Sequence, residues 1–302
     1  MIKDNKNINV FIITRFNIVT SFREGGENVK NIDTCTDVNY LEERIRLFTR
    51  YTVPSIKVQE YKNFKWIVLF SDKTPDLIKK EINRIDKDVE QFEALYINEN
   101  QAYNLSAYLK KTVEERLTSS FCLTIRLDND DAVSSCFVQD YIQFIEDNNL
   151  YSSDTTVLYY EPGIQYNESK DVATKYLYKD NHFIALFERS ENIKTIFAYD
   201  HKDLYKKLNS YSVGGGQYYW IEVLHGTNYG NITHQTLKNY IPDMSAIEEF
   251  KHLQFSVPEK ILKKKVWLLF QPLIRVELII KRHGFFETIR RIIYRIINKS
   301  II

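Results

Sequence analysis

The chain has 302 residues, and its 41 Lys and Arg residues against 40 Asp and Glu residues leave a formal net charge of only +1 at pH 7. A hydrophobic share of 44% and an aromatic share of 14% are enough for a large core and exclude a disordered or low-complexity chain. The balanced charge gives no reason to expect a nucleic-acid partner, and three cysteines without a CxxC pair argue against a zinc site or a disulfide framework.

In the N-terminal half, apolar runs of strand length alternate with segments of helical periodicity. The first helical stripe is expected to end near Pro54, and the second to begin with Thr74 as N-cap and Pro75 at its first position. This alternation predicts an α/β fold, in which parallel strands are joined by right-handed crossovers and covered by helices on both faces. The strands are predicted at residues 10–13, 66–70, 92–97 and 121–127, and the helices at residues 41–48, 77–85 and 102–117.

The pattern changes after about residue 150. Stretches rich in Tyr, Thr or Phe at residues 155–161, 175–179 and 183–187 predict antiparallel strands that extend the sheet. No apolar run is long enough for a membrane-spanning helix, and the N-terminus lacks a secretory signal, so the mature chain is expected to be the chain as written, inside the cell. The change of composition near Pro258 predicts a catalytic domain at residues 1–257 and a basic helical tail at residues 258–302.

The fourth predicted strand runs directly into three carboxylates, Asp128, Asp130 and Asp131. Ligands of open α/β sheets bind beyond the carboxyl ends of the strands, and clustered carboxylates repel one another unless a cation lies among them. Mg²⁺ or Mn²⁺ would relieve that repulsion and hold a diphosphate as well. The alternative is a solvated turn whose acids cap a helix at residues 133–146, but it explains less well why all three acids follow a core strand.

Five segments carry a resemblance to a known family through their order and spacing. They are Phe11–Asn17, Arg46–Gln59, Phe64–Trp66, Arg126–Ala132, and Trp220 with His225–Asn228. Together they resemble the bacterial family of putative rhamnosyltransferases, glycosyltransferases of the GT-A type, over roughly residues 8–240. The resemblance implies a GT-A (Rossmann-like) mixed sheet flanked by helices, to which the tail adds a C-terminal helical extension.

The resemblance also implies a reaction, the transfer of a sugar from a nucleotide-diphosphate donor to a hydroxyl acceptor with Mn²⁺ or Mg²⁺ as cofactor. In that scheme Asp130 is a direct metal ligand, Asp128 faces the ribose or the metal through water, and Asp131 supports Asp130. The metal neutralises charge on the departing diphosphate, while the anomeric carbon develops oxocarbenium character. Arg126, directly before the acids, is a candidate for substrate binding.

Further candidates lie on other segments of the chain. Arg15 and Asp72, at the ends of the first two strands, lie where the nucleotide is expected, although a structural salt bridge for Arg15 and a turn cap for Asp72 are equally good interpretations. His225 with Asn228 is the candidate on the donor side, because a neutral imidazole can complete a metal shell. A hydrogen-bonded core residue is the alternative for His225.

A reaction that inverts configuration needs a carboxylate that takes the proton of the acceptor. Glu222 is the first candidate, because a Glu among Trp and Tyr residues can have a raised pKa. A surface acid in a strand is the alternative interpretation, and Glu161 and Asp200 remain competitors.

The basic tail contrasts with the rest of the chain. Residues 260–302 hold eleven Lys and Arg residues and two acids, Glu277 and Glu287. Phe and Ile residues at helical spacing between 285 and 297, with basic residues opposite, predict an amphipathic helix, and the apolar segment Trp267–Phe270 follows three lysines. Such a helix can lie in an anionic membrane surface. The alternatives are a helix docked on the acidic body of the chain or a dimer interface.

These features lead to one functional hypothesis and one alternative. The hypothesis is a metal-dependent glycosyltransferase of hexosyl type, with rhamnose as one candidate sugar, that builds a surface glycan such as a capsule or O-antigen. It would be peripheral on the cytoplasmic face of the cell membrane, with a glycan or lipid-linked acceptor. The alternative is a non-catalytic protein of GT-A fold that binds glycans or nucleotides.

Overall fold

The computed structural model describes residues 7–19, 21–24, 27–30, 35–199, 204, 207–226, 233–253, 255, 263–271 and 273. The chain divides into two compact units. The main unit comprises Met1–Gly163, Leu177–Glu222 and Ser245–Phe255, and the second unit comprises Ile164–Tyr176, Val223–Met244 and Ser256–Ile302. The boundary predicted near residue 258 falls among residues outside this description and stays a prediction.

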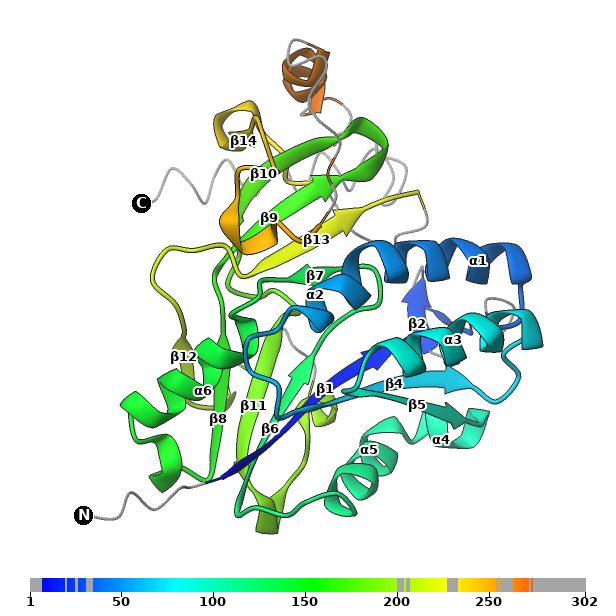
Figure 1. The fold of residues 1–302 in the computed structure, drawn as a ribbon, viewed down its shortest axis with the longest axis vertical. Helices are drawn as coiled ribbons and strands as arrows, with labels where there is room; N and C mark the ends of the chain where they lie inside the picture. The colour runs from blue at the N-terminus through cyan, green and yellow to red at the C-terminus, as the bar shows by residue number, and fades with distance from the viewer. Residues whose placement is uncertain are drawn as a thin grey trace. The chain divides into compact units, whose positions relative to one another are not determined.

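The main unit is built on a seven-stranded sheet of order β12-β8-β11-β6-β1-β4-β5. Six of its strands share one direction, and only β11 runs antiparallel to its neighbours β6 and β8. The predicted mixed α/β sheet flanked by helices is therefore confirmed (Figure 1). The strands are β1 (Ile8–Arg15), β4 (Lys65–Ser71), β5 (Phe92–Ile97), β6 (Phe121–Arg126), β8 (Thr155–Tyr159), β11 (Ile184–Arg189) and β12 (Ser210–Ser212).

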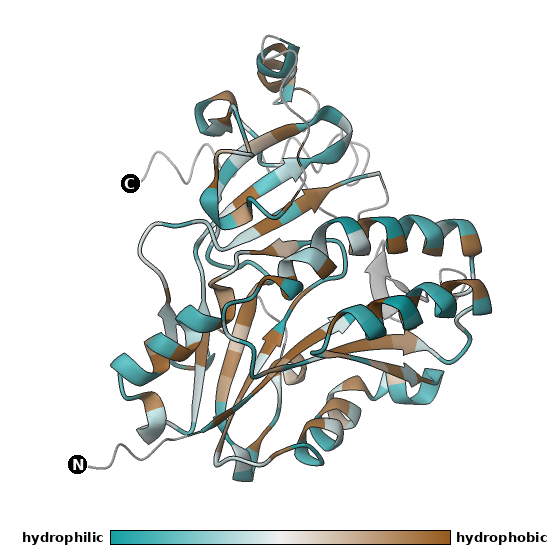
Figure 2. Cartoon of the chain, in the orientation of Figure 1, coloured by the Kyte–Doolittle hydropathy of each residue, from teal (hydrophilic) through white to brown (hydrophobic). Residues whose placement is uncertain are grey.

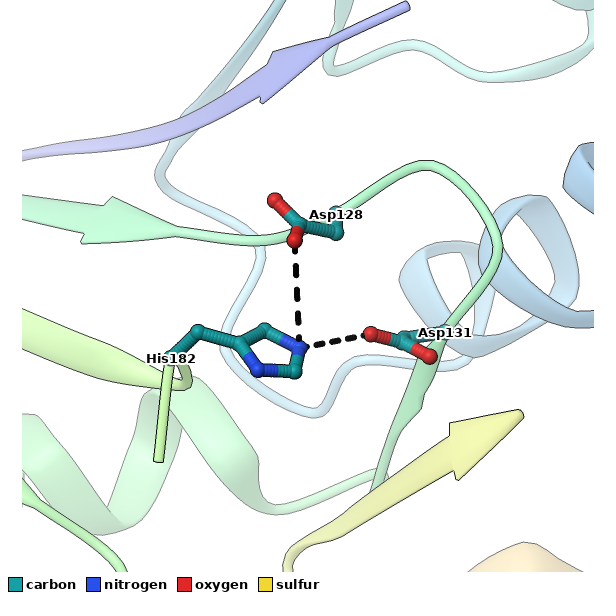
Figure 3. A group of neighbouring side chains, drawn as sticks. All are labelled: Asp128, Asp131 and His182. Carbon is teal, nitrogen blue, oxygen red and sulfur yellow. Dashed lines mark hydrogen bonds and ion pairs between the residues drawn. The ribbon is translucent and has the colours of Figure 1, made fainter. Parts of the chain in front are cut away.

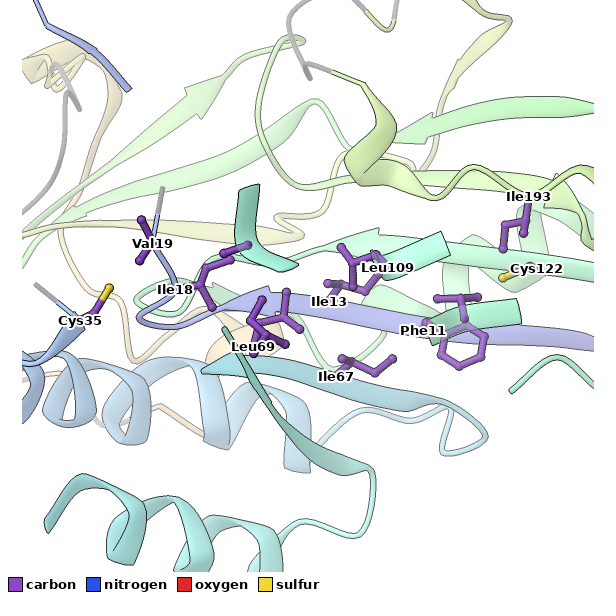
Figure 4. Packing of buried hydrophobic residues seen from close by; sticks show 13 residues of the cluster. Phe11, Ile13, Ile18, Val19, Cys35, Ile67, Leu69, Leu109, Cys122 and Ile193 are labelled. Atoms are coloured by element: carbon purple, nitrogen blue, oxygen red, sulfur yellow. The ribbon is translucent and has the colours of Figure 1, made fainter. Parts of the chain in front are cut away.

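Both faces of this sheet are buried, as the continuous apolar strands predict. On one face, Ile13 of β1 and Leu69 of β4 pack against Leu109 of a covering helix (Figure 4). On the other face, Trp66 of β4 is fully buried and its ring lies 5.2 Å from that of Phe48. Figure 2 shows the apolar colour concentrated in the strands and on the inward sides of the helices.

The helices of the main unit follow from their caps and apolar faces. Helix α1 begins after Asp37, whose carboxylate accepts a hydrogen bond from Tyr40 N at 3.0 Å, and α4 begins with a capping box of Asn98 and Gln101. The helices are α1 (Val38–Leu47), α2 (Val53–Lys57), α3 (Asp76–Asp88), α4 (Glu99–Tyr103), α5 (Leu105–Glu114) and α6 (Phe137–Asp147). The single helix predicted at residues 102–117 is thus divided at Asn104.

Two helix ends differ from the prediction. The chain does not leave the helical path near Pro54, because a π-helical turn (Phe48–Thr52) links α1 to α2 and Val53 N bonds to Phe48 O. Pro54 then lies in the first turn of α2, where its missing N–H costs nothing. Thr74 does not cap α3, because its hydroxyl donates to Ser71 O at 2.6 Å and Pro75 occupies the N-cap position.

Smaller strands complete the described chain. In the main unit, β7 (Ala132–Val133) pairs antiparallel with the first residues of β13 (Trp220–Leu224), and β2 (Ser21–Glu24) forms a hairpin with β3 (Glu27–Lys30). In the second unit, β10 (Val172–Leu177) pairs antiparallel with β14 (Tyr240–Ile241). The strand predicted at 175–179 therefore does not extend the large sheet, while β9 (Pro162–Asn167) passes from the main unit into the second.

The described part of the tail consists of a short helical segment at residues 263–271 and of residue 273. Within the residues that the structure describes, no helix has the length and apolar character needed to cross a membrane. The amphipathic helix predicted between residues 285 and 297 lies outside the described residues.

Candidate active site

The acidic cluster lies at the carboxyl end of β6, next to the carboxyl end of β1. These strands are parallel, with Ile13 opposite Arg126, and Leu127 N donates to Ile13 O at 3.2 Å. The chain then turns out of the sheet through residues 128–131 and enters β7. Asn129 holds this turn, because its side-chain amide donates to Arg15 O and Phe16 O, each at 2.9 Å. The acids therefore lie at the sheet edge where α/β proteins bind ligands.

Asp130 is turned towards α1. Its Oδ2 atom accepts a hydrogen bond from Arg44 Nη1 at 3.0 Å, and the two side chains are only 11% and 9% exposed. Burial would lower the pKa of Arg44, but the neighbouring Asp130 carboxylate raises it above its ordinary value. On the same side of the turn, the hydroxyl of Thr52 donates to Asp131 O at 2.8 Å. Asp130 thus joins the acidic turn to the first helix through a buried ion pair.

Asp128 and Asp131 are turned the other way, towards His182 (Figure 3). His182 Nε2 lies 2.7 Å from Asp131 Oδ2 and 3.9 Å from Asp128 Oδ2. One donor atom from each of the three residues lies within 4.8 Å of the other two, and among the described residues no other group of His, Cys, Asp and Glu converges in this way. Two carboxylates and an imidazole at this spacing fit a single divalent ion.

His182 is fixed by the turn that leads into β11. The side chain of Asn181 donates to Tyr160 O at 2.8 Å and to Tyr178 O at 2.6 Å, which holds the turn. The His182 ring lies 4.2 Å from that of Phe183, which is stacked on Trp220 at 4.9 Å. The stacked rings of Phe183 and Trp220 therefore pack against the imidazole and limit its rotation.

Burial and charge set the protonation of this group. Burial, followed by the neighbouring Asp130, raises the pKa of Asp131 to about 7. Burial would lower the pKa of His182, but its hydrogen bond to Asp131 and the charge of Asp128 raise it to about 9. Of the two groups, His182 therefore holds the proton of this hydrogen bond more strongly. Because Nε2 is also the atom that would bind an ion, an ion and a proton compete for it.

Asp128 stays ionised because it faces cations. Burial would raise its pKa, but Arg126, then His182 and Arg15, hold it well below the usual range. Arg126 Nη2 lies 3.3 Å from Asp128 Oδ2. Burial and the neighbouring Arg126 lower the pKa of Arg15 to about 10. The protein itself therefore supplies cations to the clustered acids, and their mutual repulsion alone does not require a metal.

The other sequence candidates are not members of the converging group. Asp72 lies exposed in the turn after β4, and its backbone N–H donates to Ile97 O at 2.9 Å. Glu222 is half-buried on β13 of the main unit, and His225 follows that strand in the second unit.

Three candidates remain. Glu161 is exposed, while Asn228 and Asp200 lie outside the described residues.

The sequence analysis missed His182, although the sequence contained a signal. His182 directly precedes the apolar stretch at residues 183–187, which was predicted as an antiparallel strand. In the structure this strand, β11, pairs with β6 so that Ala185 is opposite Ile125. Continuing that register by three residues brings His182 opposite Asp128, since antiparallel partners move in opposite directions along the two strands. A correct pairing of β11 with β6 would have predicted the contact.

Comparison with known proteins gives one family. A family model described as "Putative rhamnosyl transferase" matches residues 9–236, whereas no curated protein matches the chain. Solved structures that resemble it include S. aureus TarS 1-349, with 11% identity, a TM-score of 0.38 and coverage of 72% of this chain and 60% of that chain. A putative nucleotide-diphospho-sugar transferase from Desulfovibrio desulfuricans G20 shows 9% identity, a TM-score of 0.30 and coverage of 66% and 68%. The chain thus spans less than two thirds of the TarS fragment.

Proposed function

We propose that this chain, which belongs to the family of putative rhamnosyl transferases, is a glycosyltransferase that moves a sugar from a nucleotide-diphosphate donor to a hydroxyl acceptor with the help of a divalent cation. The observation that carries this proposal is the convergence of Asp128, Asp131 and His182 beside Arg15 and Arg126. Carboxylates for a metal and guanidinium groups for a diphosphate then lie at one edge of the sheet.

The donor atoms indicate which ion fits. Asp128, Asp131 and His182 would hold it through two carboxylate oxygens and one imidazole nitrogen. Mg²⁺ prefers an all-oxygen shell, whereas Mn²⁺ accepts imidazole more readily, so we propose Mn²⁺ as the better cofactor. When bound, the ion would act as a Lewis acid on the departing diphosphate. Asp130, the direct ligand expected from the sequence, would first have to release Arg44.

The chain's own cations contribute to the same step. Arg15 and Arg126 flank Asp128, and we assign them to the diphosphate of the donor, whose negative charge grows as the sugar leaves. Fixed guanidinium groups in a partly buried site stabilise such charge more strongly than water does. We also propose that Asp72 and Asn228 bind the donor, as the sequence predicts. His225 is retained as a further candidate ligand of the metal.

The acceptor hydroxyl has to lose a proton. We propose Glu222 as the general base, since it is half-buried on β13 and a partly desolvated carboxylate binds a proton more readily. Asp131 has a pKa of about 7, which also suits proton transfer, but as a metal ligand it would not be available for that role. The two assignments for Asp131 are therefore mutually exclusive.

The proposed location is the cytoplasmic face of the membrane, where a lipid-linked acceptor for a surface glycan would lie. The helical segment 263–271 has one buried side, on which Lys264 Nζ pairs with Asp171 Oδ2 at 2.5 Å and Leu268 is buried. Its other side exposes apolar side chains together with Lys263 and Lys265. Lysines beside exposed apolar residues suit an anionic lipid surface. The exposed apolar residues are Val266, Leu269, Phe270 and Leu273.

Liposome flotation tests this location. Replacing Phe270 by Ser should weaken binding to vesicles that contain anionic lipid by about fivefold, which corresponds to roughly 1 kcal/mol for a side chain that is only partly inserted. Leu177→Ser is the matched control, because Leu177 is also exposed but lies on β10. Equal flotation of both variants and the wild type would remove this surface from the proposal.

Calorimetry with common nucleotide diphosphates, with and without Mn²⁺, tests the catalytic proposal. We expect binding of at least one nucleotide that weakens at least tenfold when EDTA removes the ion. Hydrolysis of a panel of nucleotide sugars then identifies the donor. Binding without hydrolysis or transfer would favour a non-catalytic protein that binds nucleotides, and absence of both binding and hydrolysis would favour one that binds glycans.

A further inference from the structure

One buried residue near the site has an unusual backbone conformation. Thr195 has φ 71° and ψ 157° and is fully buried. This region is almost restricted to glycine, and a β-branched residue in it is strained. Such strain persists only where the surrounding structure holds the backbone in place, so the contacts of this segment indicate what it is held for.

Two side chains of the large sheet hold the strained segment. The carboxylate of Glu188 on β11 accepts hydrogen bonds from Lys194 N and Thr195 N, each at 3.0 Å. The hydroxyl of Thr124 on β6 accepts one from Ile196 N at 2.9 Å. Three consecutive backbone N–H groups are therefore fixed by two buried side chains. A carboxylate is costly to bury, and here it is used to hold one turn of chain.

The residue that this turn presents is Phe197. The guanidinium carbon of Arg15 lies 5.5 Å from the centroid of its ring, and that of Arg126 lies 5.9 Å from it. The two cations repel each other, and each is attracted to the electron-rich face of an aromatic ring. One ring therefore contacts both arginines that flank Asp128.

We infer that Phe197 is a positioning residue of the donor site, which holds Arg15 and Arg126 side by side so that both guanidinium groups can bind one diphosphate. Without the ring, Arg126 would be free to close fully on Asp128, which it already contacts at 3.3 Å, and Arg15 would lose its partner on that side. The arrangement is preorganised for an anion, since the arginines need not be ordered at the moment of binding. The identification of the anion as a diphosphate rests on the proposed function.

The test compares variants of Phe197 by calorimetry with inorganic pyrophosphate, in EDTA and again with Mn²⁺. We expect Phe197→Leu to bind pyrophosphate about tenfold more weakly than the wild type, and Phe197→Tyr to bind within about twofold of it, because only the aromatic ring attracts the cations. Melting temperatures of both variants report whether the fold is retained.

Phe121→Leu is the matched control. Phe121 begins β6, at the opposite end from Arg126, and its ring has the guanidinium group of Arg189 at 5.3 Å. This variant should lose stability without losing affinity for pyrophosphate. Unchanged affinity in Phe197→Leu, or an equal loss in Phe197→Tyr, would overturn the positioning role even if nucleotide diphosphates bind. Failure of the wild type to bind any nucleotide diphosphate with Mn²⁺ would instead overturn the proposed function.

Discussion

The aspartates on the two sides of the acidic turn have different kinds of partner. On one side, Asp130 and Arg44 form a closed, buried ion pair. On the other side, Asp131 shares a proton with His182, and Asp128 lies between that pair and Arg126. The difference arises from the partner, because a guanidinium group cannot lose its proton at physiological pH, whereas an imidazole can. One side is therefore suited to holding the structure together, and the other to exchanging a proton for an ion.

Asp130→Asn should have the largest effect on stability of the variants considered, and it distinguishes a structural role of Asp130 from metal binding. Leaving Arg44 buried without its partner is expected to lower the free energy of unfolding by about 3–5 kcal/mol, measured by urea denaturation. Mn²⁺ affinity of the remaining folded protein should stay within about threefold of the wild type. The sequence analysis leads to the opposite expectation, an intact fold without metal-dependent transfer.

The double variant Arg44→Gln with Asp130→Asn serves as the control for this prediction. It removes both charges and replaces them with groups that can still hydrogen-bond, so most of the lost stability should return. A stable Asp130→Asn variant that no longer binds Mn²⁺ would show that the direct ligand is Asp130 and would reverse the comparison between the two sides.

Glu188→Gln examines a buried acid that belongs to neither of these arrangements and whose carboxylate accepts hydrogen bonds from backbone N–H groups. Burial raises the pKa of Glu188 from 4.5 to about 7, although two backbone N–H groups oppose the shift. The folded state therefore binds an additional proton between about pH 4.5 and 7, and the stability of the wild type should fall as pH rises through this window. Relative to Glu188→Gln, the fall should be about 3 kcal/mol at most.

Urea denaturation of both proteins at pH 4.5, 6 and 7.5 measures this difference. A difference that is constant across the window would mean that Glu188 has the same pKa in the folded and unfolded chain. The comparison also shows what burial does to a carboxylate when no arginine or histidine lies beside it.

The sequence predicted the strands that carry the site but not which side chains contact one another in it. Strands β1, β4 and β6 are continuous apolar runs, and a polar cluster at the end of such a run has to lie at the edge of the sheet. The partner of each acid depends on tertiary structure, since Arg44 is 86 residues from Asp130 and His182 is 51 residues from Asp131. The π-helical turn before Pro54 was also missed, because apolar spacing does not report a one-residue widening of a helix.

His182→Ala tests the other side of the turn. Loss of one of three ligands should weaken Mn²⁺ binding by about 10- to 100-fold, or roughly 1.4–2.7 kcal/mol, as measured by calorimetry of the metal alone. The stability of the fold should change less than in Asp130→Asn, since the Asp131 carboxylate left without His182 can take up a proton, whereas the Arg44 guanidinium group left without Asp130 cannot lose one.

His234→Ala is the control for this variant. His234 belongs to the second unit, where its ring is stacked on Tyr176 at 5.1 Å, so its loss should leave Mn²⁺ affinity unchanged. If His182→Ala binds the ion as tightly as His234→Ala does, the imidazole is not a ligand and its bond to Asp131 is structural.

The second unit offers a more exposed counterpart of the Arg44–Asp130 pair and the smallest expected effect. Lys264 and Asp171 also join a helical segment to the rest of their unit, but their side chains are 12% and 28% exposed. Water reaches this pair more easily, so Lys264→Met, which keeps the apolar stem, should weaken docking of residues 263–271 by only about 1 kcal/mol. Hydrogen exchange of these amides should then be about fivefold faster, while Lys265→Met, on the exposed side of the same segment, should leave it unchanged. Equal exchange in both variants would mean that the pair contributes nothing to docking, and that only the more deeply buried pair of the main unit anchors its helix by charge.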